Sequence, residues 1–286
     1  MTATLDRRLH AFRPDLADRR LQGTIDAARF TEGETAHLVV PIADLRPAPD
    51  LSKGIDTQVL FGEDVTVFDR ADGWAWVACA NDSYVGYLRE EALAPGPATP
   101  THLIARPRTF VYPGPDLRFP RVHALSIGSR IEVTGEAETR GTRYFLLADG
   151  TAVVADHCRE IGAAPALDAV GFAETLLETP YLWGGRSGFG IDCSGLVQTA
   201  LAMVGKKAPR DSDMQAAGLG EPIDPKVDGL RRGDLVFWKG HVAFIEDERT
   251  ILHASGATMS VTREPLADAV RRIAAQYGEP SGYRRP

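Results

Sequence analysis

Hydrophobic and polar positions divide the chain into segments with different periods. In residues 1–34, the apolar residues Leu5, Leu9, Phe12 and Leu16 recur at intervals of three to four positions. This spacing is typical of an amphipathic helix. The pattern therefore predicts a short N-terminal helical arm that packs on the rest of the protein.

Short alternating strands dominate the next two segments, residues 35–95 and 101–162. Closely spaced strands with turn signals between them predict a small β-barrel in each segment. The Pro-rich residues 94–100 form a stiff, extended linker between them. Both segments share the order of strand, Pro-containing turn, long excursion, Gly-initiated strand and hairpin. We therefore expect an approximate internal duplication of one barrel.

The last segment, residues 165–286, combines helices and strands. Helical spacing extends from Leu167 to Leu177, and again from Leu196 to Val204. Three apolar strands joined by turns then occupy residues 233–252. Helices followed by an antiparallel sheet predict an α+β domain. The expected fold is thus an α+β domain preceded by two small all-β barrels and the helical arm.

Composition and charge exclude several classes of protein. The chain has 286 residues, 44% of them hydrophobic and 25% charged, which is ordinary for a folded protein and wrong for a disordered one. There are 32 Lys and Arg residues against 39 Asp and Glu, giving a net charge of −7. Scattered basic residues in an acidic protein argue against nucleic-acid binding. No apolar run approaches the ~20 residues of a membrane-spanning helix, so we expect no membrane partner.

The cysteines and the N-terminus bear on the cellular compartment. Three cysteines, Cys79, Cys158 and Cys193, are too few for a disulfide framework. The first ten residues lack the apolar core of a secretory signal, and no lipidation site follows. These features predict a cytoplasmic protein with reduced thiols. Export by a route without a recognisable signal is the alternative.

Cys193 stands where a glycine-rich stretch gives way to a helix. A helix N-terminus offers unpaired N–H groups and a partial positive charge, which stabilise a thiolate. Asp192 fits the N-cap position, and the preceding glycines allow the backbone to approach a substrate closely. A thiolate nucleophile also needs an acid, usually an imidazole, to protonate the departing amine. The sequence favours Cys193 as a nucleophile, with a structural thiol as the alternative.

Two histidines could supply that imidazole. His241 opens one predicted strand and His253 ends the next. A hairpin that turns at residues 247–249 would place position 241 opposite about position 255. His253 would then lie on the same face of the sheet as His241, about 7 Å away. This arrangement suits an orienting group behind a catalytic base.

Other readings of these residues remain open. Cys79, within a barrel strand, and Cys158, near a barrel end, are expected to be structural thiols. A zinc site built from Cys193 and the two histidines would lack the usual short ligand spacings. Glycines in residues 184–190 could cradle a phosphate, but no Lys-Ser/Thr ending follows them. We therefore expect no metal and no organic cofactor.

The motifs around these residues resemble a known family. They are Pro180-Tyr181-Leu182-Trp183-Gly184-Gly185, Asp192-Cys193-Ser194-Gly195, Gly233-Asp234-Leu235-Val236-Phe237-Trp238, Gly240-His241-Val242-Ala243 and Leu252-His253-Ala254. In this order they are similar to the signatures of the NlpC-type papain-like cell-wall peptidases. The resemblance implies a papain-like fold for residues 165–286, with Cys193 as nucleophile, His241 as general base and acid, and His253 as the orienting residue. It also implies that Tyr181 helps the Cys193 N–H to stabilise the oxyanion.

The barrel segments carry a second resemblance. Leu45-Arg46-Pro47, Thr57-Gln58-Val59-Leu60-Phe61-Gly62-Glu63, Gly73-Trp74 and Tyr84-Val85-Gly86-Tyr87 resemble a bacterial SH3 domain. Two such domains ahead of the catalytic domain are similar to the γ-D-glutamyl-L-diamino acid endopeptidases. That family cleaves the bond between the γ-carboxyl of D-Glu and meso-diaminopimelate in murein peptides with a free N-terminal L-Ala.

A free amine in a closed pocket must meet a carboxylate, because its desolvation is otherwise uncompensated. The resemblance implies that Asp192 and Ser194 contribute to this pocket, together with an acidic residue and a tyrosine of the first barrel. Asp56 and Tyr84 are the candidates, with Glu63 as a substitute for Asp56. For Asp192, simple helix capping is an equal alternative, and both roles can hold at once.

Arg186 could pair bidentately with a substrate carboxylate such as the α-carboxyl of D-Glu, or it could brace its own loop. The expected substrate is L-Ala-γ-D-Glu-meso-diaminopimelate, met during recycling of wall fragments in the cytoplasm. Three rival functions remain: an exported endopeptidase that acts on intact wall, a wall-peptide binding module with an idle thiol, and a thioester acyltransferase on the same core.

Overall fold

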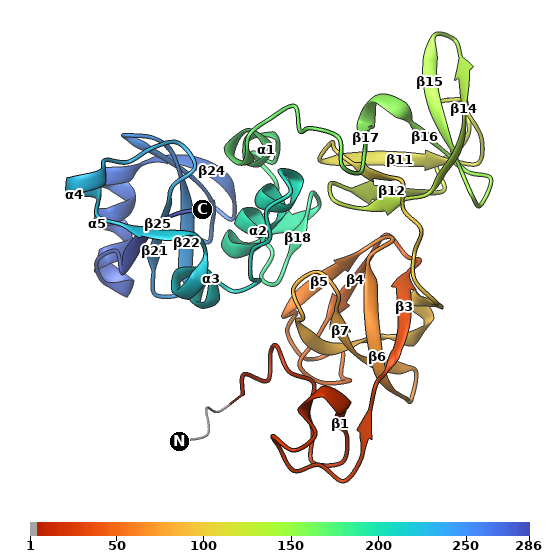
Figure 1. Cartoon of the computed structure of the whole chain (residues 1–286). Helices are drawn as coiled ribbons and strands as arrows, with labels where there is room; N and C mark the ends of the chain where they lie inside the picture. The colour runs from red at the N-terminus through yellow and green to blue at the C-terminus, as the bar shows by residue number, and fades with distance from the viewer. Residues whose placement is uncertain (1–4) are drawn as a thin grey trace. The chain divides into compact units, whose positions relative to one another are not determined.

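The computed structural model describes residues 5–286 and divides into two compact units, Met1–Gly162 and Ala163–Pro286 (Figure 1). Within residues 5–286, no helix has both the length and the apolar character needed to cross a membrane.

The N-terminal segment is not the predicted helical arm. Between residues 5 and 34 the structure has strands β1 (Ala17–Asp18) and β2 (Phe30–Thr31), paired in parallel, and a 3-10 helix η1 (Arg19–Leu21), but no α-helix. The prediction was wrong because Pro14 interrupts the periodic run. Proline lacks the N–H that a helix interior needs, and it disfavours the helical conformation of the residue before it.

The segment nevertheless packs on the first barrel. Ala11 and Leu16 are buried in a cluster with Phe68 and Trp76, so the apolar positions are buried by an irregular chain rather than by one helix face. The Arg13 guanidinium lies 4.5 Å from the centre of the Trp76 ring. Such a contact stabilises a cation over an aromatic face.

The first barrel contains seven strands. They are β3 (Glu34–Leu38), β4 (Ile42–Leu45), β5 (Thr57–Leu60), β6 (Asp64–Ala71), β7 (Trp74–Cys79), β8 (Val85–Arg89) and β9 (Leu93–Pro95), with a 3-10 helix η2 (Glu90–Ala92) before β9. The sheet order is β8-β7-β6-β3-β9, and β4 pairs with β5. Leu38, Leu45, Leu60 and Leu88 are fully buried and form part of its core.

A second set of strands repeats this pairing scheme. It comprises β10 (His102–Ile104), β11 (Arg108–Tyr112), β12 (His123–Ser126), β13 (Arg130–Ile131), β14 (Val133–Thr139), β15 (Thr142–Leu147), β16 (Ala152–Val154), the 3-10 helix η3 (Ala155–His157) and β17 (Cys158–Glu160). β3 pairs with β6 and β9 in the first set, as β10 pairs with β13 and β17 in the second. β7 lies between β6 and β8, as β15 lies between β14 and β16. The same order of pairing therefore occurs twice along the chain.

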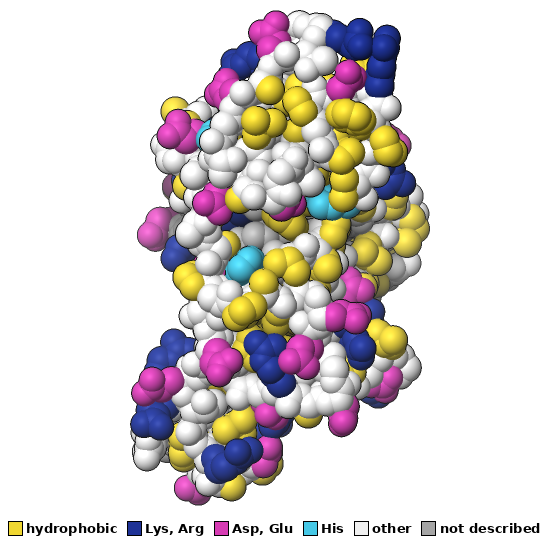
Figure 2. All heavy atoms as spheres, turned by 90° about the vertical axis from the view of Figure 1, so that its right-hand side faces the viewer, with side chains coloured by type: hydrophobic (Ala, Val, Ile, Leu, Met, Phe, Trp, Pro, Cys, Tyr) yellow, Lys and Arg dark blue, Asp and Glu magenta, His cyan; other side chains and the backbone are white. Residues whose placement is uncertain are grey.

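The surface of the protein carries charges of both signs. Figure 2 shows acidic and basic side chains interspersed on the face that it presents. This mixture of signs agrees with a chain in which acidic residues only moderately outnumber basic ones, giving a net charge of −7.

The second unit contains helices and one main sheet. Its helices are α1 (Ala169–Thr175), α2 (Cys193–Met203), α3 (Ser212–Gly218), α4 (Pro225–Asp228) and α5 (Leu266–Tyr277). Its strands are β18 (Arg186–Ser187), β19 (Gly190–Ile191), β20 (Glu221–Ile223), β21 (Leu235–Trp238), β22 (His241–Asp247), β23 (Thr250–Ser255), β24 (Ser260–Pro265) and β25 (Gly282–Arg285). The main sheet is antiparallel, in the order β20-β25-β21-β22-β23-β24.

Helices α2 and α5 cover opposite faces of this sheet. On one face, Ala269 and Ile273 of α5 pack with Ala243 and Ile245 of β22. Because side chains alternate along a strand, Phe244 and its even-numbered neighbours point to the other face. Helix α2 contacts β22 and β23 there. Helices and an antiparallel sheet in one unit agree with the α+β class predicted for this part of the chain.

Candidate active site

Cys193 is the first residue of helix α2. The hairpin of β18 and β19 leads directly into this helix, and Asp192 is its N-cap. The Asp192 Oδ1 accepts a hydrogen bond of 2.7 Å from the Gly195 N–H, which satisfies one donor that the helix itself cannot pair. The predicted capping role of Asp192 is thus confirmed.

Close backbone packing fixes the start of α2. A Cβ added at Gly195 would lie 2.3 Å from the Gly185 carbonyl oxygen, and a Cβ at Gly185 would lie 2.5 Å from the Gly190 oxygen. Gly184 has a φ of +77°, a conformation that residues with a side chain rarely adopt. These glycines therefore let the loop lie directly against the helix that carries Cys193.

A buried arginine contacts the residues on both sides of Cys193. Arg210 is 1% exposed, and its Nη1 and Nη2 donate to the two carboxylate oxygens of Asp192 at 3.0 and 2.7 Å. Nη1 also donates to the Ser194 Oγ at 2.9 Å. The residues on both sides of Cys193 are thereby held by one guanidinium, whose desolvation is compensated by a bidentate partner. Sequence reasoning had given Arg210 no role.

The predicted substrate residues of this unit lie close to that ion pair. The Asp192 Oδ2 accepts a further hydrogen bond of 2.9 Å from the Gly184 N–H, and the Ser194 Oγ lies 3.3 Å from the Asp192 Oδ1. Arg186 begins β18 and is buried. Its carbonyl accepts a hydrogen bond from the Thr199 hydroxyl of α2.

The two histidines lie on the same face of the sheet. β22 and β23 pair Phe244 with Leu252 and Ile245 with Ile251, which continues to position 241 opposite position 255, as the sequence predicts. The Nε2 of His241 lies 2.9 Å from the Nδ1 of His253, within hydrogen-bond distance. The His253 side chain is fully buried, so its orientation is fixed by its surroundings.

Cys193 lies beside the strand that carries His241. The backbone N–H of Val242, the residue after His241, donates a hydrogen bond to the Cys193 sulfur. The sulfur therefore lies next to the peptide bond between His241 and Val242. This contact brings helix α2 and strand β22 together at the point where each begins.

Burial favours the neutral form of Cys193 and of His241. It raises the pKa of the Cys193 thiol to about 12, although the Val242 and Ser194 N–H groups and Arg210 act in the opposite direction. Burial also lowers the pKa of His241 to about 3 and that of His253 to about 4. The helix N-terminus favours a thiolate, as the sequence predicts, whereas the desolvation of a 6% exposed cysteine favours the thiol.

The Tyr181 phenol lies near the ionisable groups of Cys193 and Asp192. Its backbone N–H donates to the Met259 carbonyl at 2.8 Å. Burial, followed by the nearby Cys193 and Asp192, raises the pKa of the Tyr181 phenol. The phenol therefore stays protonated and can donate a hydrogen bond.

The two barrel candidates lie in the first unit. Asp56 precedes β5, and its N–H donates to the Leu45 carbonyl at 2.9 Å. Tyr84 is buried just before β8, and its carbonyl accepts a hydrogen bond of 2.9 Å from the Cys79 N–H. The substitute candidate, Glu63, is buried and accepts hydrogen bonds from the Leu60 N–H and the Asn81 amide.

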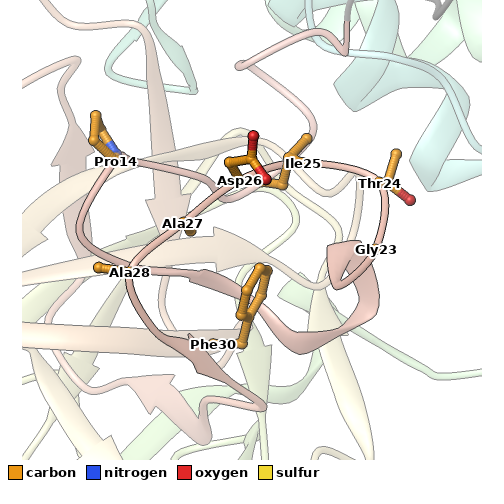
Figure 3. Close-up of a pocket in the computed structure, with 8 residues that line it drawn as sticks. All are labelled: Pro14, Gly23, Thr24, Ile25, Asp26, Ala27, Ala28 and Phe30. Carbon is orange, nitrogen blue, oxygen red and sulfur yellow. The ribbon is translucent and has the colours of Figure 1, made fainter.

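Within residues 5–286, neither a metal-binding cluster nor the cavity of the N-terminal segment offers a second site of this kind. No group of three His, Cys, Asp or Glu side chains within residues 5–286 is arranged to hold a metal ion. An open cavity of about 630 Å³ lies in the N-terminal segment (Figure 3). It is lined by Pro14, Gly23, Thr24, Ile25, Asp26, Ala27, Ala28 and Phe30, which include neither a nucleophilic thiol nor an imidazole.

The ion pair leads to a first prediction. Arg210→Met would leave the Asp192 carboxylate buried without a partner, so we expect the free energy of unfolding of the second unit to fall by about 3–5 kcal/mol. Urea unfolding measures this change. Arg263→Met, which breaks a more exposed pair with Glu246, should cost about 1 kcal/mol or less. Equal losses for the two variants would contradict the prediction, whereas adding Asp192→Asn to Arg210→Met should restore part of the loss.

The neutral histidines predict a dependence of stability on pH. Both pKa values are depressed in the folded state, so the unfolded chain takes up protons first as pH falls below about 6.5. Stability should therefore be complete above pH 6.5 and decrease by on the order of 2 kcal/mol or more by pH 5. Hydrogen exchange of peptides from β22 and β23 at both pH values reports on this unit. His241→Gln should reduce the dependence, and an unchanged slope would refute the assignment.

Comparisons with known proteins agree with this geometry. Residues 178–275 match the NlpC/P60 family, and residues 45–93 match the bacterial dipeptidyl-peptidase SH3 domain. A γ-D-glutamyl-L-lysine dipeptidyl-peptidase of Bacillus subtilis (strain 168) is 31% identical over 219 residues, covering 70% of this chain and 68% of the relative. The peptidoglycan endopeptidase RipB of Mycobacterium tuberculosis (strain ATCC 25618 / H37Rv) is 34% identical over 114 residues, covering 34% and 46%.

A solved structure shows the same fold. The crystal structure of an NlpC/P60 family protein from Bacillus cereus superposes with a TM-score of 0.72 at 24% identity, covering 88% of this chain and 99% of the other. Together with the relative from Bacillus subtilis, these matches show that the chain belongs to the NlpC/P60 family of cysteine peptidases and carries a bacterial SH3 domain ahead of its peptidase domain.

Proposed function

We propose that this peptidase hydrolyses the bond between the γ-carboxyl of D-Glu and meso-diaminopimelate in murein peptides that begin with a free L-Ala. The observation that carries the proposal is the Cys193 sulfur beside the first peptide bond of β22, with His241 hydrogen-bonded to His253 behind it. The names of similar proteins, which contain γ-D-glutamyl-L-lysine, support the γ-D-glutamyl bond as the site of attack.

In the proposed reaction, the Cys193 sulfur attacks the γ-carbonyl carbon of D-Glu while His241 takes the thiol proton. Because the resting thiol and imidazole are both neutral, proton transfer accompanies the attack. The C–N bond then breaks, and the His241 imidazolium gives its proton to the departing amine. A thioester remains on Cys193, and water hydrolyses it with His241 again as the base. The products are L-Ala-D-Glu and the free diamino acid.

The negative oxygen formed in each step needs hydrogen-bond donors. We assign these to the Cys193 backbone N–H, one of the donors at a helix start that the helix itself does not pair, and to the Tyr181 phenol. The raised pKa of Tyr181 favours this role because the phenol keeps its proton at neutral pH.

We assign recognition of the substrate ends to five further residues. Ser194 and Asp192, the latter neutralised in part by Arg210, would meet the free amine of L-Ala. For Asp56 and Tyr84 of the first barrel, a role in binding the amine rests on the resemblance of the sequence alone. Arg186 would pair with the α-carboxyl of D-Glu. An ammonium that is desolvated on binding requires such carboxylate and hydroxyl partners.

The cellular role proposed here is the recycling of wall fragments in the cytoplasm, because a free N-terminal L-Ala exists only after the peptide has left the glycan. The repeated strand pairing supports a second SH3-like barrel in residues 101–162. An exported endopeptidase of intact wall is the second candidate, favoured by the likeness of the catalytic region to a peptidoglycan endopeptidase. A better rate on intact murein than on the free tripeptide would select this second candidate.

Replacing the nucleophile tests the reaction. Cys193→Ala should lower kcat/KM on L-Ala-γ-D-Glu-meso-diaminopimelate at least 1,000-fold, on the order of what the loss of a nucleophile costs, as measured by mass spectrometry of the released L-Ala-D-Glu. Cys79→Ala and Cys158→Ala remove the two other thiols and should keep most of the activity. Substantial turnover by Cys193→Ala would refute the assignment of Cys193 as the nucleophile. The L-Lys tripeptide, assayed in parallel, establishes which diamino acid is accepted.

Blocking the substrate amine tests the recognition of L-Ala. N-acetylation removes the positive charge and adds bulk at the end that the proposed site encloses, so we expect kcat/KM to fall at least 100-fold, roughly the value of a charged hydrogen-bonded contact. The acetylated and free tripeptides are compared at the same enzyme concentration. Equal cleavage of both peptides would mean that no free-amine site exists.

A further inference from the structure

A carboxylate that the proposed reaction does not use lies behind the histidine pair. Glu264 belongs to β24, and its Oε2 is 3.3 Å from the Nε2 of His253. In the register of the sheet, His253 pairs with Thr262, so Glu264 is its diagonal neighbour on the same face. The carboxylate is only 18% exposed and the His253 ring is fully buried.

Helix α5 holds this carboxylate in place. The Arg272 Nε donates to the Glu264 Oε1 at 2.9 Å, and the Arg272 Nη2 donates to Oε2 at 2.5 Å. Such a bidentate pair restricts the orientation of both planar groups. Glu264 therefore points at His253 from a fixed position, although the contact is outside ideal hydrogen-bond geometry, and His253 Nε2 has no other partner among residues 5–286.

The position of Glu264 determines which ring nitrogen of His253 carries the proton. A carboxylate can only accept a hydrogen bond, so a neutral His253 is stabilised with its proton on Nε2, facing Glu264. Its Nδ1 is then a bare acceptor. The hydrogen bond of 2.9 Å to His241 must consequently come from the Nε2–H of His241, which leaves His241 Nδ1 without a proton.

Nδ1 is the ring nitrogen nearer to the main chain of His241, where the Val242 N–H meets the Cys193 sulfur. We propose that Glu264 is a positioning residue that fixes the tautomers of His253 and His241, so that His241 presents Nδ1 as the base for the Cys193 thiol. This inference rests on the proposed function of Cys193 and His241 and extends it to a fourth residue. No proton moves to Glu264: its charge stabilises the imidazolium that forms on His241.

Charged or titratable groups face His241 from four elements. Glu264 of β24 and Asp192 before α2 favour the protonated form of His241, whereas Arg272 of α5 and His253 of β23 disfavour it. Arg272 also disfavours protonation of His253. Removing Glu264 or Arg272 should therefore change the acidity of the same imidazole in opposite directions.

The first test measures tautomers without any substrate. In the wild-type protein, uniformly labelled with ¹⁵N, long-range ¹H–¹⁵N spectra at pH 7.5 should show His253 and His241 both protonated at Nε2 and bare at Nδ1. A His253 that carries its proton on Nδ1 would overturn the inference. Because this readout needs no turnover, it holds even if the tripeptide is not a substrate.

The second test measures activity against pH. We expect Glu264→Gln to lower kcat/KM about tenfold and to shift the acidic limb of its pH profile to lower pH, since it removes the charge that favours the imidazolium. Arg272→Gln should shift the same limb upward by about one pH unit. Asp268→Asn, which breaks the ion pair with Arg271 on the same helix, is the matched control and should leave the profile unchanged.

The outcomes of these tests distinguish the positioning role of Glu264 from the proposed function of the enzyme. If the wild-type enzyme cleaves the tripeptide and neither variant moves the profile, the role of Glu264 is wrong while the proposed function stands. If no tripeptide is cleaved but the tautomers are as expected, the substrate is wrong and the positioning role stands. Shifts of both variants in the same direction would indicate a structural effect and would also refute the role.

Discussion

The buried pair of Arg210 and Asp192 is the interaction on which the arrangement around Cys193 depends. Asp192 caps α2, binds the N–H of Gly184 and pairs with Arg210, so one carboxylate joins the helix, the glycine loop and a later part of the chain. A lone buried carboxylate would be too costly, and the guanidinium removes that cost. The position of Cys193 is consequently set by the polar contacts that its two neighbours, Asp192 and Ser194, make with Arg210.

The same burial that fixes the site also determines its charge state. Desolvation opposes both a thiolate at Cys193 and an imidazolium at His241, because each would be a separate charge in a poorly solvated place. In the proposed reaction, transfer of the proton from Cys193 to His241 creates two opposite charges, which partly compensate each other. In that reaction, the two charges form only as the sulfur bonds to the substrate carbonyl.

Local signals in the sequence predicted the parts of the site that depend on neighbouring residues. The N-cap at Asp192, the glycines before it and the register of the hairpin carrying His241 and His253 follow from rules that act over a few positions. The prediction of a helical arm was wrong because it did not take into account that Pro14 interrupts a helix, which is also a local rule.

Contacts that arise only on folding could not be predicted in the same way. Arg210 reaches Asp192 from a loop after α2, and nothing in its spacing indicates a buried partner. Glu264 could have been found from the hairpin that follows His253, because Glu264 stands two positions beyond the residue paired with it. The degree of burial of Cys193 depends on the whole unit, and so the neutral thiol was not foreseen.

The low exposure of Cys193 also affects its chemistry toward small oxidants. Oxidation by peroxides begins with an accessible thiolate, and a neutral, enclosed thiol reacts slowly. Burial therefore slows sulfenic acid formation in the empty enzyme, and in the proposed reaction the sulfur becomes a strong nucleophile only as His241 takes its proton.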